Sequence, residues 1–322
     1  MDLKVPTIDF RNSSELKKGS EKWNLVRDEV FKSLEEYGCF EALLDGEIPK
    51  EKLYEKLKQV FNFNLENLFG KSQNVLVGYT RDNPSTPLQE RMMIDNVLTH
   101  GVIHNFSNLL WPEGDPQFCD LVLTYSKKLL EFGDMVRRMV FDKLGLENYL
   151  DEHKKSGDCT LAFLKYRVPK AEETNVGVPP HTDKIISTIL SQHDQDVNGL
   201  QIMDKNGQWH DVQYSSPHSY IFLVSDCLKA FTNGRLHSPT HRVIMGNEER
   251  YSMGFSTMPK EGYIIKVPEE LVDEDHPLLY KPFDGSKLLP FFYSEVRRGV
   301  IATLENFCGV SANNPNLSCT DI

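Results

Sequence analysis

The pattern of apolar residues changes near Cys159, and this change limits the folds open to the chain. Beyond it, short runs rich in β-branched and aromatic residues recur at roughly 8–12-residue intervals, and turn sequences such as Asp-Lys-Asn-Gly separate some of them. The predicted strands cover residues 159–166, 185–191, 199–203, 209–212, 220–224, 241–244, 250–257 and 263–267. This spacing is typical of a β-sandwich or barrel and argues against a parallel α/β sheet.

The first half of the chain instead predicts helices. Apolar residues recur at helical spacing over 23–37, 53–61 and 118–144, and a glycine follows the first and third of these segments. A short alternating segment at 5–10 precedes them, and a further short helix is predicted at 294–299. We therefore expect a mainly helical region over 1–155 and a β core with a C-terminal helix over 156–322, folded as one structural unit.

Composition and charge exclude several classes of protein. Of the 322 residues, 39% are hydrophobic and 26% are charged, so the chain can bury a substantial core. A net charge of −11 disfavours binding to nucleic acid or to an anionic membrane. The six cysteines are scattered without a Cys-x-x-Cys pair, which predicts a reducing compartment. Without a signal-like N-terminus or an apolar stretch of membrane length, we expect a cytoplasmic protein, and we expect it to be a monomer.

The motif that carries chemistry is Pro-Pro-His-Thr-Asp at 179–183. His181 and Asp183 lie two apart in an extended segment, so their side chains project to the same side and can bind one cation. A metal site needs at least one further ligand. His241, in a predicted strand downstream, would complete a set of two histidines and one carboxylate. Such a set leaves one face of an octahedral ion open, as in non-haem Fe(II) oxygenases.

A second group of polar residues follows in the next predicted strand. Arg250 and Ser252 lie two apart there, and a guanidinium beside a hydroxyl is a good clamp for a carboxylate. Tyr166, in the strand before the metal motif, is placed to donate a third hydrogen bond. Ala162 and Leu164 alternate with the residues between them, so these two and Tyr166 would line one wall together.

Other segments of the chain resemble those of one enzyme family. Residues 5–10 (Val-Pro-Thr-Ile-Asp-Phe) resemble its opening strand, and 36–40 (Glu-Tyr-Gly-Cys-Phe) resemble the end of its first long helix. Residues 199–202, 206–209 and 233–236 resemble the segments between the two halves of its metal motif. The chain thus resembles the plant-type 2-oxoglutarate- and Fe(II)-dependent dioxygenases over nearly its whole length. Within this family, residues 165–169 and 233–237 are similar to the corresponding segments of the branches that modify glucosinolate side chains and that oxidise gibberellin or auxin.

This resemblance implies a fold, a reaction and a set of site residues. The fold is a mainly β core, the double-stranded β-helix or jelly roll, wrapped by the N-terminal helices. The iron ligands are His181, Asp183 and His241, while Arg250 and Ser252 hold the distal carboxylate of 2-oxoglutarate. The enzyme would use O₂ and 2-oxoglutarate to oxidise a small specialised metabolite or hormone, and would release succinate and CO₂. Hydroxylation, desaturation, demethylation and ring formation are all chemically compatible outcomes.

The walls of the pocket are less closely defined. Tyr79 edges the substrate pocket by resemblance, although a packed loop aromatic is an equal alternative. Phe255 and Ser256 follow the clamp, and Ser256 is the better candidate for the cavity because it shares the pleat of Arg250. The family's usual Asn-x-Tyr is Leu-Lys-Tyr at 164–166 here, which keeps the Tyr and predicts weaker or altered hydrogen bonding to the co-substrate.

Several alternatives stay open. His237 is the alternative to His241 as a ligand, and Pro239 between them disfavours a shared helix face. His100 and His104 lie four apart, but no Glu follows His100 as a zinc-protease motif requires. A jelly-roll hydrolase or isomerase that holds zinc or manganese is one rival function. A catalytically silent relative that binds a small molecule is the other.

Overall fold

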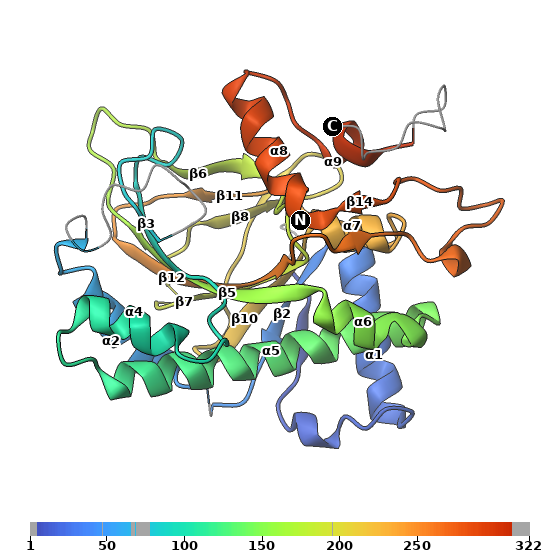
Figure 1. Ribbon diagram of the computed structural model, residues 1–322, viewed down its shortest axis with the longest axis horizontal. Coiled ribbons are helices and arrows are strands. Elements are labelled where there is room, and N and C mark those ends of the chain that lie inside the picture. Colours follow the sequence, from blue (N-terminus) through green and yellow to red (C-terminus); the bar gives the residue numbers. More distant parts are fainter. Residues whose placement is uncertain (1–4, 47, 66–67, 69–77, 195, 311–322) are drawn as a thin grey trace.

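Fourteen strands are found in the computed structural model, which describes every residue except 1–4, 47, 66–67, 69–77, 195 and 311–322 (Figure 1). They are β1 (Thr7–Asp9), β2 (Cys39–Leu43), β3 (Tyr79–Thr80), β4 (Gln89–Ile94), β5 (Gly157–Tyr166), β6 (Val176–His181), β7 (Ser187–Gln192), β8 (Leu200–Met203), β9 (Trp209–Asp211), β10 (Ser219–Val224), β11 (His241–Ile244), β12 (Arg250–Pro259), β13 (Ile264–Ile265) and β14 (Phe283–Asp284).

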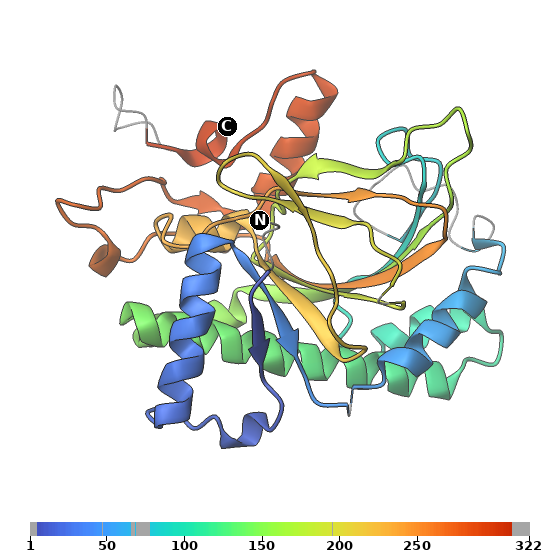
Figure 2. The same cartoon turned by 180° about the vertical axis from the view of Figure 1, so that it is seen from behind.

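These strands build the double-stranded β-helix that the sequence analysis predicted. The larger sheet has eight strands in the order β1-β2-β10-β7-β12-β5-β4-β3, and the smaller has four in the order β6-β11-β8-β9. The smaller sheet lies over the larger one (Figure 1). Strands β1 and β2, in blue in Figure 2, extend the larger sheet beyond β10. The first half of the chain therefore contributes strands as well as helices to the barrel.

The helices of the described part of the chain are α1 (Glu21–Glu36), α2 (Lys50–Val60), α4 (Val102–Leu110), α5 (Pro116–Leu144), α6 (Leu150–Lys155), α7 (Asp226–Phe231), α8 (Gly285–Arg297) and α9 (Leu304–Cys308). Those of the N-terminal half, α5 above all, cover the outer face of the larger sheet (Figure 1). Helix α5 runs along the sheet in Figure 1, whereas α8 stands at the opposite side, beside β6 and β11. In the described part of the chain, no helix is both long and apolar enough to cross a membrane.

Helix α5 has clear start and stop signals in the sequence. Asp115 caps its first turn by accepting a hydrogen bond from the Phe118 amide, and Pro116 occupies its first position. Gly145 ends it with a left-handed backbone at φ 71°. Its apolar face packs on the sheet, where the Phe132 ring meets the Phe222 ring of β10 edge to face at 6.2 Å. The core between helix and sheet fixes the outer side of the strands that carry the site.

The structure also differs from the expected elements. Strands β2, β3, β4, β6 and β14 and helices α4, α6, α7 and α9 were not predicted. The helix expected at 294–299 begins earlier and is α8. All of the strands predicted beyond Cys159 are present, with ends shifted by a few residues.

The turn between α1 and β2 lies against the segment that leads into β11. Gly38 in this turn has a left-handed backbone at φ 71°. A Cβ atom there would overlap the carbonyl oxygen of His237 and would lie 2.6 Å from Cδ of Pro239. Only glycine allows this close approach of the two backbones.

Candidate active site

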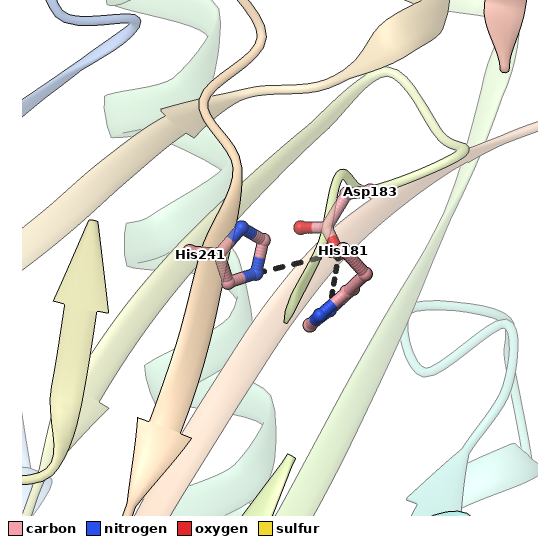
Figure 3. Close-up of side chains that lie close together, drawn as sticks. All are labelled: His181, Asp183 and His241. Atoms are coloured by element: carbon pink, nitrogen blue, oxygen red, sulfur yellow. Dashed lines mark ion pairs between the residues drawn. The ribbon is translucent and has the colours of Figure 1, made fainter. Parts of the chain in front are cut away.

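Three side chains from separate elements converge between the two sheets. His181 ends β6, Asp183 follows in the next loop, and His241 begins β11, where it pairs directly with His181 (Figure 3). Oδ1 of Asp183 lies 3.6 Å from Nε2 of His181 and 3.8 Å from Nε2 of His241. One ligand atom from each residue lies within 4.8 Å of the other two. The strand pairing of β6 and β11 thus brings together residues that are 60 positions apart in the sequence.

Backbone carbonyls orient both imidazole rings in the same way. Nδ1 of His181 lies 2.9 Å from the carbonyl oxygen of Pro179, and Nδ1 of His241 lies 3.2 Å from that of Pro239. A carbonyl can only accept, so in each neutral ring Nδ1 carries the proton and Nε2 keeps its lone pair. Both lone pairs therefore lie on the side of Asp183, where a shared cation would bind.

The electrostatics of the cluster keep its members in the form that a metal requires. Burial and the neighbouring His181 lower the pKa of His241 to about 4, so this ring is neutral at pH 7. Burial of Asp183 favours its protonated form, but His241, His181 and the Thr188 hydroxyl outweigh it and hold the pKa of Asp183 below its usual range. Thr188 donates to Oδ2 of Asp183 over 2.6 Å and leaves Oδ1 facing the histidines.

These donors fit a divalent iron ion. Two neutral imidazole nitrogens and one carboxylate oxygen, on three residues at the ends of adjacent strands, form the facial set found in non-haem Fe(II) enzymes. Hydrogen bonds to the non-ligating atoms of all three residues fix the directions of the donors, as is usual at metal sites in proteins.

A buried arginine lies deeper in the barrel. Arg250 begins β12, and its side chain donates to Oγ of Ser252 over 3.1 Å and to Oε1 of Gln192 over 3.2 Å. Its Nε is buried and has no hydrogen-bond partner in the described part of the chain. A Cβ atom on Gly199 would lie 3.1 Å from Cδ of Arg250, so glycine leaves space for this side chain. A buried guanidinium with spare donors is suited to bind a carboxylate.

The register of β5 and β12 defines the wall beside this arginine. Tyr166 pairs with Arg250, and Leu164 pairs with Ser252, so all four side chains point to the inner face of the sheet. The hydroxyl of Tyr166 accepts a hydrogen bond of 2.9 Å from the side-chain amide of Gln89 on β4. Its own proton is therefore left for a further acceptor in the barrel.

Comparison with known proteins identifies the family. A family model described as the 2OG-Fe(II) oxygenase superfamily matches residues 148–259, the segment that holds all of these residues except Gln89. A probable 2-oxoglutarate-dependent dioxygenase of Arabidopsis thaliana, AOP1.2, is 39% identical over 95% of this chain and 96% of its own. The chain belongs to the 2-oxoglutarate- and Fe(II)-dependent oxygenases. The 2-oxoglutarate-dependent dioxygenase AOP3 of the same plant is 30% identical over 92% of this chain and 95% of its own.

Solved structures share the fold of this oxygenase. The crystal structure of the dioxygenase for auxin oxidation in rice superposes with a TM-score of 0.77, at 23% identity, over 95% of this chain and 100% of that chain. A structure of JOX2 in complex with 2OG, Fe and JA gives a TM-score of 0.72 at 22% identity, over 90% of this chain and 85% of that chain. As a member of the family, the protein is a 2-oxoglutarate-dependent dioxygenase that uses Fe(II), 2-oxoglutarate and O₂.

The inner wall of this oxygenase includes some of the predicted pocket residues and not others. Ala162 and Ser256 alternate in phase with Leu164 and Arg250 and therefore face the barrel interior. Tyr79 and Phe255 point to the other face of the sheet, where both are buried in the core against the helices. The alternation of strands β3 and β12 is the physical reason for this placement.

The alternative histidines lie outside the cluster. The group of three ligand atoms found in the described part of the chain includes His241 and not His237. The exposed His100 precedes α4, and His104 lies within it, so the two do not share a helix face as zinc-protease ligands do.

Sequence reasoning missed the residues that support the site. Gln192 and Thr188, both on β7, orient Arg250 and Asp183. Neither belongs to a recognisable motif. The role of Gln192 depends on how β7 pairs with β12, whereas Thr188 reaches Asp183 across a five-residue turn. The signal that places both on one face is their even spacing, with Thr188 inside the predicted strand 185–191 and Gln192 just beyond it.

Proposed function

We propose that His181, Asp183 and His241 bind the iron of this dioxygenase, and that Arg250 and Ser252 bind the distal carboxylate of 2-oxoglutarate. The convergence of the three ligand atoms carries this proposal, since their Nε2 and Oδ1 atoms face one point. The buried and incompletely partnered guanidinium of Arg250 supports the second part. Tyr166 is proposed as a further donor to the co-substrate because its hydroxyl proton is left free by Gln89.

Bound Fe(II) supplies the site at which O₂ and 2-oxoglutarate react, giving succinate, CO₂ and a substrate oxidised by two electrons. The protein's own residues bind and orient the reactants. Gln192 and Ser252 keep the Arg250 fork directed at one end of 2-oxoglutarate, while Thr188 keeps Oδ1 of Asp183 on the metal side. Leu164 and Ala162 add apolar wall, which excludes water from the space next to the cluster.

The substrate that we propose is a small specialised metabolite or hormone. Curated relatives carry names of the AOP dioxygenases, and structural neighbours are named for auxin oxidation or were solved with JA. Hydroxylation is the proposed outcome, with desaturation and demethylation as alternatives that depend on where the reacting carbon is held. Ala162, Leu164 and Ser256 are the proposed pocket residues because they line the inner face beside the clamp.

A binding experiment followed by a turnover screen tests this function. Fe(II) and then 2-oxoglutarate are titrated into the protein without oxygen, and a visible charge-transfer band is expected only when both are present. Succinate release is then measured in air against a panel of plant acids, hormones and specialised metabolites. Saturable binding of zinc or manganese with no response to 2-oxoglutarate would instead support a hydrolase or isomerase.

We also propose that the protein is a cytoplasmic monomer that does not bind nucleic acid, and that residues 1–155 and 156–322 form one structural unit. Cys39, Cys119, Cys159 and Cys227 are free and buried, which suits a reducing compartment. Pairing of β2 with β10 and of β4 with β5 supports a single unit, because each half supplies strands to one sheet. Light scattering on a sizing column tests the monomer, and separate expression of the halves tests the unit.

A further inference from the structure

A second arginine faces the interior of the barrel. Arg91 lies on β4, directly opposite Leu164 on β5, and Leu164 lies opposite Ser252 on β12. Residues paired in this way point to one face of a sheet, so Arg91 shares the inner face with the proposed 2-oxoglutarate clamp. Its neighbour two residues earlier, Gln89, donates to Tyr166 on that same face. Arg91 therefore lies in one row with Leu164 and Ser252 of the clamp, and Arg250 lies in the neighbouring row with Tyr166 and Gln89.

The charge of Arg91 lacks an ion-pair partner among the described residues. None of the ion pairs found in that part of the chain includes Arg91, and its Nε is buried there without a hydrogen-bond partner. Asp95, four residues later, is held by the Thr160 hydroxyl at 3.1 Å. A guanidinium stays protonated in proteins, so burial leaves an unmatched positive charge beside the site. Such a charge is stabilised when an anion binds to it.

Helix α8 brings a tyrosine to the same place. Burial lowers the pKa of Arg91, and the nearby Tyr293, Tyr166 and Asp95 act against this shift. Burial likewise raises the pKa of Tyr293, on which Arg91 and Asp183 of the proposed metal cluster act as well. Tyr293 therefore lies near both Arg91 and the proposed metal cluster.

We propose that Arg91, assisted by the Tyr293 hydroxyl, binds a carboxylate of the organic substrate and so restricts this dioxygenase to acidic substrates. The inference rests on the proposed function of the site and names the class of molecule that it takes.

Geometry separates this carboxylate from that of the co-substrate. Arg91 and Ser252 are two strand spacings apart, roughly 10 Å, which lets two different carboxylates bind without sharing a guanidinium. Leu164 lies between them and presents an apolar side chain to both ligands. The Arg250 fork, held by Ser252 and Gln192, is the group proposed above to bind 2-oxoglutarate. Arg91 is therefore left for the substrate.

Calorimetric titration of the Fe(II)- and 2-oxoglutarate-loaded protein without oxygen tests the proposal. The probes are indole-3-acetate, phenylacetate and hexanoate, each compared with its neutral primary amide. The unaltered protein should bind at least one acid more tightly than its amide. In Arg91→Gln, affinity for that acid should fall roughly ten- to a hundredfold, because a charge-assisted hydrogen bond is lost. Affinity for the amide and for 2-oxoglutarate should stay within about threefold.

Further variants keep the result interpretable. Arg91→Lys keeps the charge and should retain part of the preference for acids, even if Arg91→Gln is unstable. Tyr293→Phe should lower the affinity for the acid by only a few fold. The control is Arg167→Gln, which removes an exposed arginine just beyond the end of β5 that pairs with Glu173.

Two results would overturn the assignment of Arg91. In the first, the unaltered protein binds none of the acids more tightly than the corresponding amide. In the second, Arg91→Gln loses affinity for 2-oxoglutarate and keeps its affinity for the acid. Failure of the unaltered protein to bind Fe(II) and 2-oxoglutarate at all would instead count against the proposed function.

Discussion

The guanidinium carbon of Arg250 lies 5.3 Å from the centroid of the Tyr166 ring, across the pair formed by β12 and β5. The aromatic face supports a cation that has been removed from water. Ser252 and Gln192 accept two of its N–H groups, and the absence of a side chain on Gly199 leaves room for its stem. The arginine is therefore held in place before any ligand binds, which lowers the entropy lost when 2-oxoglutarate is bound.

Replacing Arg250 with Lys should weaken 2-oxoglutarate binding. The ammonium keeps the charge but loses the planar fork, so affinity should fall by about 1.5–3 kcal/mol, or roughly ten- to a hundredfold. Anaerobic titration of the Fe(II)-loaded protein measures this change. Arg167→Lys, at an exposed arginine, is the matched control. Unchanged affinity in Arg250→Lys would contradict the clamp.

Removing the Tyr166 hydroxyl should have a smaller effect on the same ligand. Tyr166→Phe keeps the ring beneath Arg250 and removes one donor, so 2-oxoglutarate binding should weaken by about 0.5–1.5 kcal/mol. Equal binding by the Phe variant would show that Tyr166 only packs the barrel wall.

Leu164→Asn distinguishes two roles for Leu164, which lies between Arg91 and Ser252. If Leu164 replaces a polar contact to the co-substrate, Asn should leave 2-oxoglutarate affinity equal or higher. If Leu164 contacts the apolar part of a substrate, Leu164→Asn should weaken binding of the substrate and leave binding of 2-oxoglutarate unchanged. Both ligands are tested because Leu164 lies opposite both Arg91 and Ser252. Titration of both ligands against this variant decides between the two roles.

Single alanine variants of the proposed iron ligands should abolish succinate formation that depends on substrate. Each of His181, Asp183 and His241 is proposed to supply one of three donors. The histidines lie at strand ends and Asp183 lies in the loop after β6, so the fold should persist. Circular dichroism checks folding, and bound iron is measured directly. His237→Ala should keep full activity, whereas full activity in His241→Ala would exclude it as a ligand.

Thr188→Val should lower iron affinity without removing a ligand. The valine has nearly the same shape but cannot donate to Oδ2 of Asp183, so the carboxylate loses its orientation and Fe(II) affinity should fall about 10- to 100-fold. Thr160→Val is the control, because its hydroxyl binds Asp95, just beyond the end of β4, at 3.1 Å. Equal Fe(II) affinity in both variants would show that Thr188 has no such role.

The stability of the protein should depend on pH through His153. Burial between the rings of Phe141 and Phe231 lowers the pKa of His153 to about 3, with Arg137 adding to the effect. The folded state therefore resists a proton that the unfolded chain accepts below its ordinary pKa of about 6.5. This contribution to stability is complete above that value and is lost as the pH falls toward 3.

His153→Leu should remove this dependence. The free energy of unfolding of the unaltered protein should decline between pH 6.5 and 4 more steeply than that of the variant, by at most about 1.4 kcal/mol per pH unit. Urea unfolding of both proteins at several pH values measures the difference in slope. Parallel curves would show that His153 does not contribute. The other histidines are present in both proteins, so their effects cancel.

The sequence correctly predicts those helices and strands in which the spacing of apolar residues and the positions of glycine and proline indicate the same element. Helix α5 was placed within two residues of its bounds because its apolar period and Gly145 indicate one helix. Helix α8 was placed too late, since Pro290 interrupts its pattern from within. Strand β6 contains Pro179 and Pro180, and these prolines are tolerated because the strand lies at an edge of the smaller sheet.

The sequence analysis did not predict strand β4 because one side of this strand faces the proposed site. Its inner residues, Gln89 and Arg91, are polar because they line the proposed site, so the strand lacks the apolar alternation by which strands are usually found. His181 and Asp183 of the proposed iron site could be found together because they lie two apart in sequence. Thr188 is only five residues after Asp183 but belongs to no motif. Gln192 and Tyr293 could not be placed, because the pairing of β7 with β12 and the position of α8 bring them to the site.

The close approach at Gly38 links the first helix to iron retention. A side chain at this position would push back the backbone of His237 and Pro239, and the Pro239 carbonyl is the group that sets the proton on His241. Damage at the α1–β2 turn would thus first appear as a protein that folds but releases its metal, with the lesion some 200 residues before the ligand that it misplaces. A mutational survey that covers only the proposed ligands and the Arg250 clamp would not detect substitutions of Gly38 that act in this way.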